Sequence, residues 1–381
     1  MLLNEELIKN SEIMNFKIYK LGGLGIVLGL LIFSCGKKSP DSENPTENGF
    51  DKSAMLANYA DNVIVPAYLG LQQQLSPLEV AINAFLASPT QANQDLAKAA
   101  FKLAYQKFER VSSIQFGPGN TYLQNNFLNT LPAEPENDNN AGINAIENNA
   151  ATGNYNLTLN STTNQQGFPA LDYLLFAPDA IQKLSAAGSE KRKKYVQDVV
   201  ARMKDITGHI VTDWQGTYRA TFVANTKTDV GSPIGSMVER FANEMDKMKG
   251  PRIGWPFGKQ SGGLIFPEKC EGYYSGISLS LAIENITGLK EMYTGGGNGK
   301  GISDYLIALK KEQLNKDVLK QFDLVIADLN AIPNPLSASL NNQKPLVETA
   351  YKDIQILLTL IKTDVASATG VRITYQDSDG D

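Results

Sequence analysis

Apolar side chains recur three or four positions apart along most of this chain of 381 residues, and strand-like alternation is scarce. Such spacing places the apolar side chains on one face of an α-helix. It is clearest over residues 54–71, 101–108, 195–214, 234–248, 274–292, 314–329 and 346–361. The pattern therefore predicts an all-α protein, with two helical bundles packed side by side and long irregular loops.

Proline, serine and glycine indicate where these helices begin, bend or end. Pro66 is expected to kink the first helix. The run Ser76–Glu79 matches a capping box with proline at the first helical position, which predicts a new helix there. Ser88 and Pro89 should break the next stretch, and the glycine-rich run 295–299 should stop the helix before it.

The helical pattern lapses between Gly117 and Gly167, where fourteen asparagines fall between Asn120 and Asn164. A run of this kind inside a domain predicts a long irregular excursion with short helical turns. We expect it to belong to an N-terminal bundle over residues 51–230. Residues 231–381 would then form a C-terminal bundle.

The amino terminus has the pattern of a bacterial lipoprotein signal. Lys17 and Lys20 precede an apolar run over residues 21–33, which is too short to cross a bilayer as a helix. A serine and then Cys35 follow the run directly, as in a lipobox that is cleaved and acylated at cysteine. Residues 1–34 are therefore predicted to be a signal peptide.

Met14 begins a conventional signal of its own and is an alternative start of the chain. Residues 35–50 are rich in Lys, Ser, Pro, Asn and Glu, a composition typical of a flexible tether. We expect the protein to lie in the cell envelope, anchored to the outer membrane by the acylated Cys35. The periplasmic face and the cell-surface face both remain open.

Composition excludes several function classes. The net charge of −5 offers no electrostatic basis for binding nucleic acid. One histidine, His209, rules out mechanisms that need two, including the H-E-x-x-H zinc peptidases. We expect His209 to be partly buried and hydrogen-bonded. Cys270, the only thiol left after acylation of Cys35, is expected to be a small buried side chain.

Two regions place aromatic and conformationally restricted residues outside the helical stripes. One is the run 167–176, and the other joins residues 252–258 to residues 267–275. Restricted backbone combined with polar groups is typical of pocket walls. Ordinary loop packing explains the pattern almost as well.

At these regions the chain resembles the imelysin-like lipoproteins of the bacterial envelope. The resemblance covers almost the whole chain after the signal, and it implies two helical bundles with a site between them and a link to iron uptake. Some members of that family were first described as peptidases. The matching segments, in order, are Tyr59–Pro66, Phe116–Pro118, Glu271, Tyr274–Ser275, Asn285–Leu289, Tyr293–Gly295, Gly370–Val371 and Asp377–Asp381.

The chain departs from that family at its signature, G-x-H-x-x-E, whose His and Glu are taken to be metal ligands or catalytic groups. Gly167 aligns with its first position, but Pro169 replaces the histidine and Asp172 the glutamate. Ser112 also stands where members tend to have an acidic residue. The motif is therefore degenerate. Because a zinc site needs about three protein ligands, loss of the histidine makes peptidase activity doubtful. We assign no catalytic residues.

The leading hypothesis is a non-catalytic envelope lipoprotein that binds a small ligand or metal between its bundles, in association with iron or haem uptake. Iron is the candidate metal, since hard cations prefer carboxylate and phenolate oxygens, and Asp172 is its candidate ligand. A metallopeptidase and a docking scaffold for an outer-membrane transporter are the alternatives. The candidate ligand-binding residues are Asp172, Tyr173, Arg252, Glu271, Tyr274 and Ser275.

Overall fold

The computed structural model describes residues 49–130, 141–297 and 299–375. The predicted signal peptide, with Cys35, lies outside the described residues, as do all but the last two residues of the predicted tether and the acidic carboxyl end. No strand occurs in the part that the structure describes, so the all-α prediction is confirmed. Within these residues, no helix is both long and apolar enough to cross a membrane.

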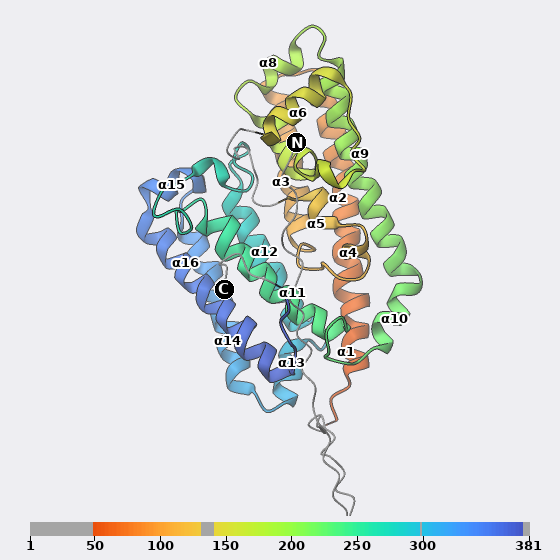
Figure 1. The fold of residues 1–381 in the computed structure, drawn as a ribbon, viewed down its shortest axis with the longest axis vertical. Coiled ribbons are helices and arrows are strands. Elements are labelled where there is room, and N and C mark those ends of the chain that lie inside the picture. The colour runs from red at the N-terminus through yellow and green to blue at the C-terminus, as the bar shows by residue number, and fades with distance from the viewer. Residues whose placement is uncertain (1–48, 131–140, 298, 376–381) are drawn as a thin grey trace, which may run out of the picture. The chain divides into compact units, whose positions relative to one another are not determined.

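The helices of the first half pack around α2, which contacts both α3 and α9 along their lengths (Figure 1). They are α1 (Lys52–Asn58), α2 (Val65–Ala87), α3 (Gln91–Glu109), α4 (Pro118–Thr121), α5 (Gln124–Leu128), α6 (Ala141–Thr152), α7 (Gly167–Phe176), α8 (Ala180–Ser185), α9 (Glu190–Asp213) and α10 (Arg219–Ala224). Wider π-helical turns, Tyr59–Ile64 and Trp214–Tyr218, precede α2 and follow α9.

The second half is built around α12, α14 and α16, with α14 packed against both of the others (Figure 1). Its helices are α11 (Pro233–Lys247), α12 (Ser278–Thr294), α13 (Ile302–Ala308), α14 (Glu312–Ala331), α15 (Leu336–Asn342), α16 (Lys344–Thr359) and α17 (Ala366–Thr369). A π-helical turn, Met248–Gly254, extends α11, and another, Leu360–Val365, extends α16. The division into bundles at residue 230 stays a prediction.

The expected helix start at Ser76 is wrong. Helix α2 runs unbroken from Val65 to Ala87, with Pro77 inside it. Leu71, Leu75 and Leu78 are fully buried on one face of this helix. Their burial holds the helix together across a proline that removes one backbone hydrogen bond. The capping-box pattern at Ser76–Glu79 therefore does not mark a helix start.

Other helix ends follow the sequence signals. Helix α2 ends at Ala87, before Ser88, and Gly295 caps α12 in the left-handed conformation, with a φ of 78°. Helix α12 begins at Ser278 rather than near Tyr274, so Tyr274 and Ser275 belong to a turn. The asparagine-rich region contains more regular helix than expected, since α6 alone is twelve residues long.

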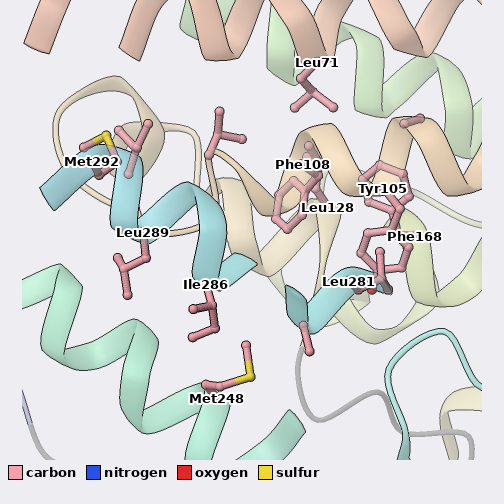
Figure 2. Packing of buried hydrophobic residues seen from close by; sticks show 14 of the residues in the cluster. Leu71, Tyr105, Phe108, Leu128, Phe168, Met248, Leu281, Ile286, Leu289 and Met292 are labelled. Atoms are coloured by element: carbon pink, nitrogen blue, oxygen red, sulfur yellow. The ribbon is translucent and has the colours of Figure 1, made fainter. Parts of the chain in front are cut away.

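The two halves meet through α12, which also packs against α3. Figure 2 shows Ile286 and Leu289 of α12 pointing toward the turn that carries Met248. On the first-half side, the rings of Tyr105 and Phe168 stack 4.2 Å apart. All of these side chains are at most 1% exposed. One continuous apolar core therefore runs between the halves, and the polar groups described next are embedded in it.

Candidate functional site

Four charged side chains meet in the buried region between the two halves. The guanidinium of Arg252 donates from Nε to Glu271 at 2.9 Å, from Nη1 to Glu244 at 2.6 Å and from Nη2 to Glu109 at 2.8 Å. The four side chains are between 0% and 3% exposed. Charges buried this completely are stable only when they are paired and hydrogen-bonded. We call these four residues the Arg252 cluster.

The cluster draws its members from four segments. Glu109 ends α3, Glu244 lies in α11, Arg252 lies in the π-helical turn after α11, and Glu271 lies in the turn before α12. The amide of Asn285 in α12 donates to Glu109 at 2.9 Å and to Glu244 at 2.8 Å. A single hydrogen-bond network therefore ties α3 to the segments that follow residue 230.

The charges in this cluster do not balance, because three carboxyl groups share one guanidinium. Burial and the neighbouring carboxylates raise the pKa of Glu109 well above its usual value. Burial also opposes ionisation of Glu244, but the charges of Arg252 and Lys247 outweigh it and lower its pKa to about 2. The protonated form is therefore favoured at Glu109 and the ionised form at Glu244.

Asp172 lies in α7 and uses both carboxylate oxygens to hold the turn before α12. One oxygen accepts the backbone N–H of Tyr274 at 2.9 Å, and the other accepts that of Ser275 at 3.0 Å. Burial raises the pKa of Asp172 to about 6, although these hydrogen bonds favour its charged form. Asp172 is therefore a clasp between α7 and the turn that contains Glu271, Tyr274 and Ser275.

The residues before Asp172 fix how α7 begins. Gly167 has a φ of 74°, and a Cβ atom there would lie 2.3 Å from the carbonyl oxygen of Leu128. Only glycine avoids both the strained backbone and this overlap. Pro169 is the third residue of α7, where a missing N–H costs no helical hydrogen bond. Proline is thus compatible with the local backbone.

A narrow pocket opens beside these residues, with an empty volume of about 490 Å³. Little of it is wide enough for a water-sized sphere, so we call it the crevice. Of the predicted residues, Pro169, Asp172, Tyr173 and Tyr274 line it, whereas Gly167, Arg252, Glu271 and Ser275 do not. Its other walls are Thr130, Ile143, Ile146, Asn164, Ala170, Cys270, Gly272 and Tyr273.

Three tyrosine rings stand together at the crevice. Tyr173 and Tyr274 meet edge to face with ring centroids 5.4 Å apart, and Tyr273 meets Tyr274 at 5.1 Å. The hydroxyl of Tyr173 donates to Glu147 at 2.6 Å. The ammonium group of Lys183 also contacts Glu147, at 3.0 Å, and lies 5.5 Å from the Tyr173 ring. The rings are therefore held in fixed orientations around the opening.

The imelysin family model, peptidase family M75, matches residues 64–361. The chain belongs to the imelysin family. Iron-regulated protein A of Synechococcus elongatus is 24% identical over 336 residues, which cover 84% of each protein. The resemblance found in the sequence is confirmed.

Two solved structures of imelysin-type proteins share the fold. A candidate iron-regulated protein A precursor from Parabacteroides distasonis superposes with a TM-score of 0.69 at 20% identity, over 86% of this chain and 97% of the other. An imelysin-like protein from Psychrobacter arcticum gives a TM-score of 0.68 at 16% identity, over 85% and 97%. These TM-scores establish a shared architecture.

The residues at the degenerate motif do not fit a metal ion. Pro169 has no ligating atom, and both oxygens of Asp172 already accept backbone N–H groups. Over residues 49–130, 141–297 and 299–375, no three His, Cys, Asp or Glu side chains form a group that could hold a metal. We therefore derive no metal-dependent step for this chain.

The structure also tests the predictions made for two single residues, His209 and Cys270. His209 is exposed rather than partly buried, with a side chain that is 56% accessible; its Nδ1 lies 2.9 Å from the carbonyl oxygen of Asp205. Its neighbour Ile210 faces the core, and adjacent helical positions point in different directions. Cys270 is fully buried as expected, and burial raises the pKa of its thiol.

Sequence reasoning missed Glu109 and Glu244. Glu109 lies eight and four residues after the buried rings of Phe101 and Tyr105, on the buried face of α3. The sequence did contain a signal for Glu109: it is a charged residue at a position where the helical spacing predicts an apolar one. Glu244 follows Phe241 in the same way in α11.

Replacing Asp172 with alanine should lower the free energy of unfolding by about 2–4 kcal/mol, because it leaves two backbone N–H groups without an acceptor. Urea unfolding of the full chain measures the change. Asp179→Ala is the control, since Asp179 forms only an exposed ion pair with Lys183. Equal losses in the two variants would contradict the clasp.

Replacing Glu109 with glutamine should change the free energy of unfolding by less than about 1 kcal/mol at pH 7, whereas Glu244→Gln should lower it by about 3 kcal/mol. Glutamine mimics a protonated Glu109, but in place of Glu244 it removes a charged partner of Arg252. Urea unfolding at neutral pH compares the two. A larger loss in Glu109→Gln would show that Glu109 is ionised.

The same variants predict a difference in pH dependence. The pKa of Glu109 is higher in the folded state than in the unfolded state, where it is 4.5. The stability that this difference contributes is complete below pH 4.5 and is lost as the pH rises toward the folded-state pKa. The wild type should therefore lose stability through Glu109 as the pH rises above 4.5, and Glu109→Gln should lose less. Parallel pH profiles of the two proteins would count against a buried proton.

Replacing Gly167 with alanine should destabilise the protein by at least about 3 kcal/mol, because the new Cβ overlaps the Leu128 carbonyl. Gly188 is the matched control: its φ is 82°, but no atom lies within 4 Å of the added Cβ. Gly188→Ala should cost only about 1 kcal/mol, from the backbone conformation. Thermal unfolding of both variants tests whether the close approach at Gly167 matters.

Proposed function

We propose that this imelysin-family chain is a non-catalytic lipoprotein of the bacterial envelope that binds an iron complex at the mouth of the crevice, as a component of iron uptake. The observation that carries the proposal is the place of Pro169. It lies in the wall of the crevice, at the position where the family motif has histidine. The crevice therefore presents an apolar ring where a metal ligand would be needed for hydrolysis.

The surroundings of the crevice support binding without catalysis. Its walls come from residues 130–173 and from residues 270–274, so it lies where segments from both halves of the chain meet. The carboxylate of Asp172, at its edge, has both oxygens engaged by backbone N–H groups. These two hydrogen bonds give the carboxylate a structural task, holding the turn before α12.

The link to iron rests on the relatives. The curated relative in Synechococcus elongatus is named an iron-regulated protein, and the neighbour from Parabacteroides distasonis is described in the same words. A bare ion does not suit this chain, because the described residues hold no suitable group of ligands. An iron complex, in which the ion brings its own chelator, does not need ligands from the protein.

Anchoring and partners complete the proposal. The apolar run 21–33 and Cys35 support attachment to the outer membrane through an acylated cysteine. A protein is held at a membrane more stably by two membrane-binding signals than by a single acyl chain. We propose that an outer-membrane transporter of the iron complex is the protein partner.

The test is equilibrium binding of the full chain, purified in detergent, to radiolabelled ferric citrate, ferric tris-catecholate and haemin, with zinc ions for comparison. At least one iron complex should bind with one-to-one stoichiometry, and zinc should not. Ile143→Trp, which fills the crevice, should weaken that binding at least tenfold. Asn148→Trp should not, since Asn148 is exposed on the same helix and does not line the crevice.

Two results would overturn the proposal. Equal binding by the two tryptophan variants would place the ligand elsewhere. Cleavage of a protein substrate by the wild type, abolished by a chelator, would show that the chain is a metallopeptidase after all.

A further inference from the structure

The hairpin formed by α2 and α3 exposes three large apolar side chains. Val80 of α2 is 70% exposed, and Leu96 and Leu103 of α3 are 64% and 52% exposed. Leu96 and Leu103 lie seven residues apart, with the exposed Ala99 between them, so these three side chains share one face of α3. A single exposed leucine is ordinary, but an exposed apolar stripe along a helix indicates a surface that binds something.

The exposed face of α2 continues this stripe. Helix α2 lies between α3 and α9 and contacts both (Figure 1). Its edge toward α3 is marked by Gly70, where an added Cβ would lie 3.8 Å from Lys107. The solvent-facing positions next to that edge are spaced three and four apart and carry no charge. We call the joint surface of the two helices the hairpin face; it consists of Pro77, Val80, Ala84, Leu96, Ala99 and Leu103.

Helix α3 carries more positive than negative charge beside its leucines. Lys102 and Lys107 are exposed and form no ion pair with any residue that the structure describes. Lys98, which is half-buried, lies 5.9 Å from the ring of Phe176. Against these three lysines, Asp95 is the one exposed acidic residue of the helix. Exposed leucines flanked by unpaired lysines are typical of a helix that lies on an anionic membrane surface.

The predicted anchor places a bilayer within reach of this face. The thirteen residues between Cys35 and Gly49 span up to about 45 Å when they are extended. Helix α1 begins three residues after Gly49, and α2 follows it through a single π-helical turn. A chain anchored at Cys35 can therefore place α2 and α3 along the surface of the same membrane. The hairpin face would then be the second membrane-binding signal.

We propose that the hairpin face lies against the surface of the membrane that holds the acylated Cys35. Val80, Leu96 and Leu103 enter the boundary between headgroups and acyl chains, and Lys102 and Lys107 lie beside anionic headgroups. The inference rests on the proposed function for the anchor at Cys35. It goes beyond that function because it gives the folded part of the chain a lipid-binding surface of its own.

The experiment uses the full acylated chain, dilute in vesicles of phosphatidylethanolamine and phosphatidylglycerol. A fluorophore is attached to the cysteine of Leu103→Cys and, as a control, to that of Ile356→Cys, since Ile356 is an exposed apolar residue of α16. The native Cys270 is buried and should take up no label. Lipids that carry a nitroxide near the headgroup should quench the label at position 103 at least twofold more than the label at position 356.

A second pair of variants tests the apolar contact itself. Leu96→Asp puts a charge on the hairpin face and should at least halve the quenching of the label at position 103. Leu264→Asp is the matched control, because Leu264 is 65% exposed but lies in the loop before residues 267–269. Both side chains are exposed, so neither substitution should change thermal unfolding of the chain.

The outcomes separate this inference from the proposed function. Equal quenching at positions 103 and 356 in vesicle-bound chain would overturn the inference and leave the anchor intact. A label at position 103 that is shielded from iodide but not quenched by lipid would show that a second copy of the chain covers the hairpin face, which also overturns it. Labelling of the wild type at Cys35 would show that this cysteine is not acylated. The anchor and this inference would then fall together, whereas binding of an iron complex at the crevice would not be affected.

Discussion

A single guanidinium with three carboxyl partners sets the geometry of the region between the two halves of this chain. The buried charge of Arg252 is stable here because Glu109, Glu244 and Glu271 each accept one of its N–H groups. The end of α3, the middle of α11 and the turn before α12 must therefore come together at one point. Asn285 adds α12 to the same network.

The crevice depends on this arrangement. The turn before α12 is held from one side by Arg252, through Glu271, and from the other by Asp172, through the N–H groups of Tyr274 and Ser275. A turn fixed at two points keeps its side chains in place, as the proposed binding function requires. Preorganised walls of this kind reduce the entropy that binding would otherwise cost.

The helical architecture was predictable because apolar spacing reports directly on which residues are buried. The prediction failed at Pro77, where packing of three leucines outweighs a local signal. It also missed Glu109 and Glu244, because a charged side chain in a sequence indicates a solvated surface unless its partner is known. That partner, Arg252, lies 143 positions after Glu109, and no local pattern relates residues so far apart.

The degenerate motif can be understood by separating its structural tasks from its chemical ones. Gly167 is required by a left-handed backbone and the nearby Leu128 carbonyl, and Asp172 is required as an acceptor for two N–H groups. Neither task needs an imidazole between them. Because Pro169 lies in the first turn of α7, it can replace a ligating side chain without disturbing the helix. The replacement thus removes one side chain that could bind a metal while leaving the walls of the crevice intact, and it makes one of those walls more apolar.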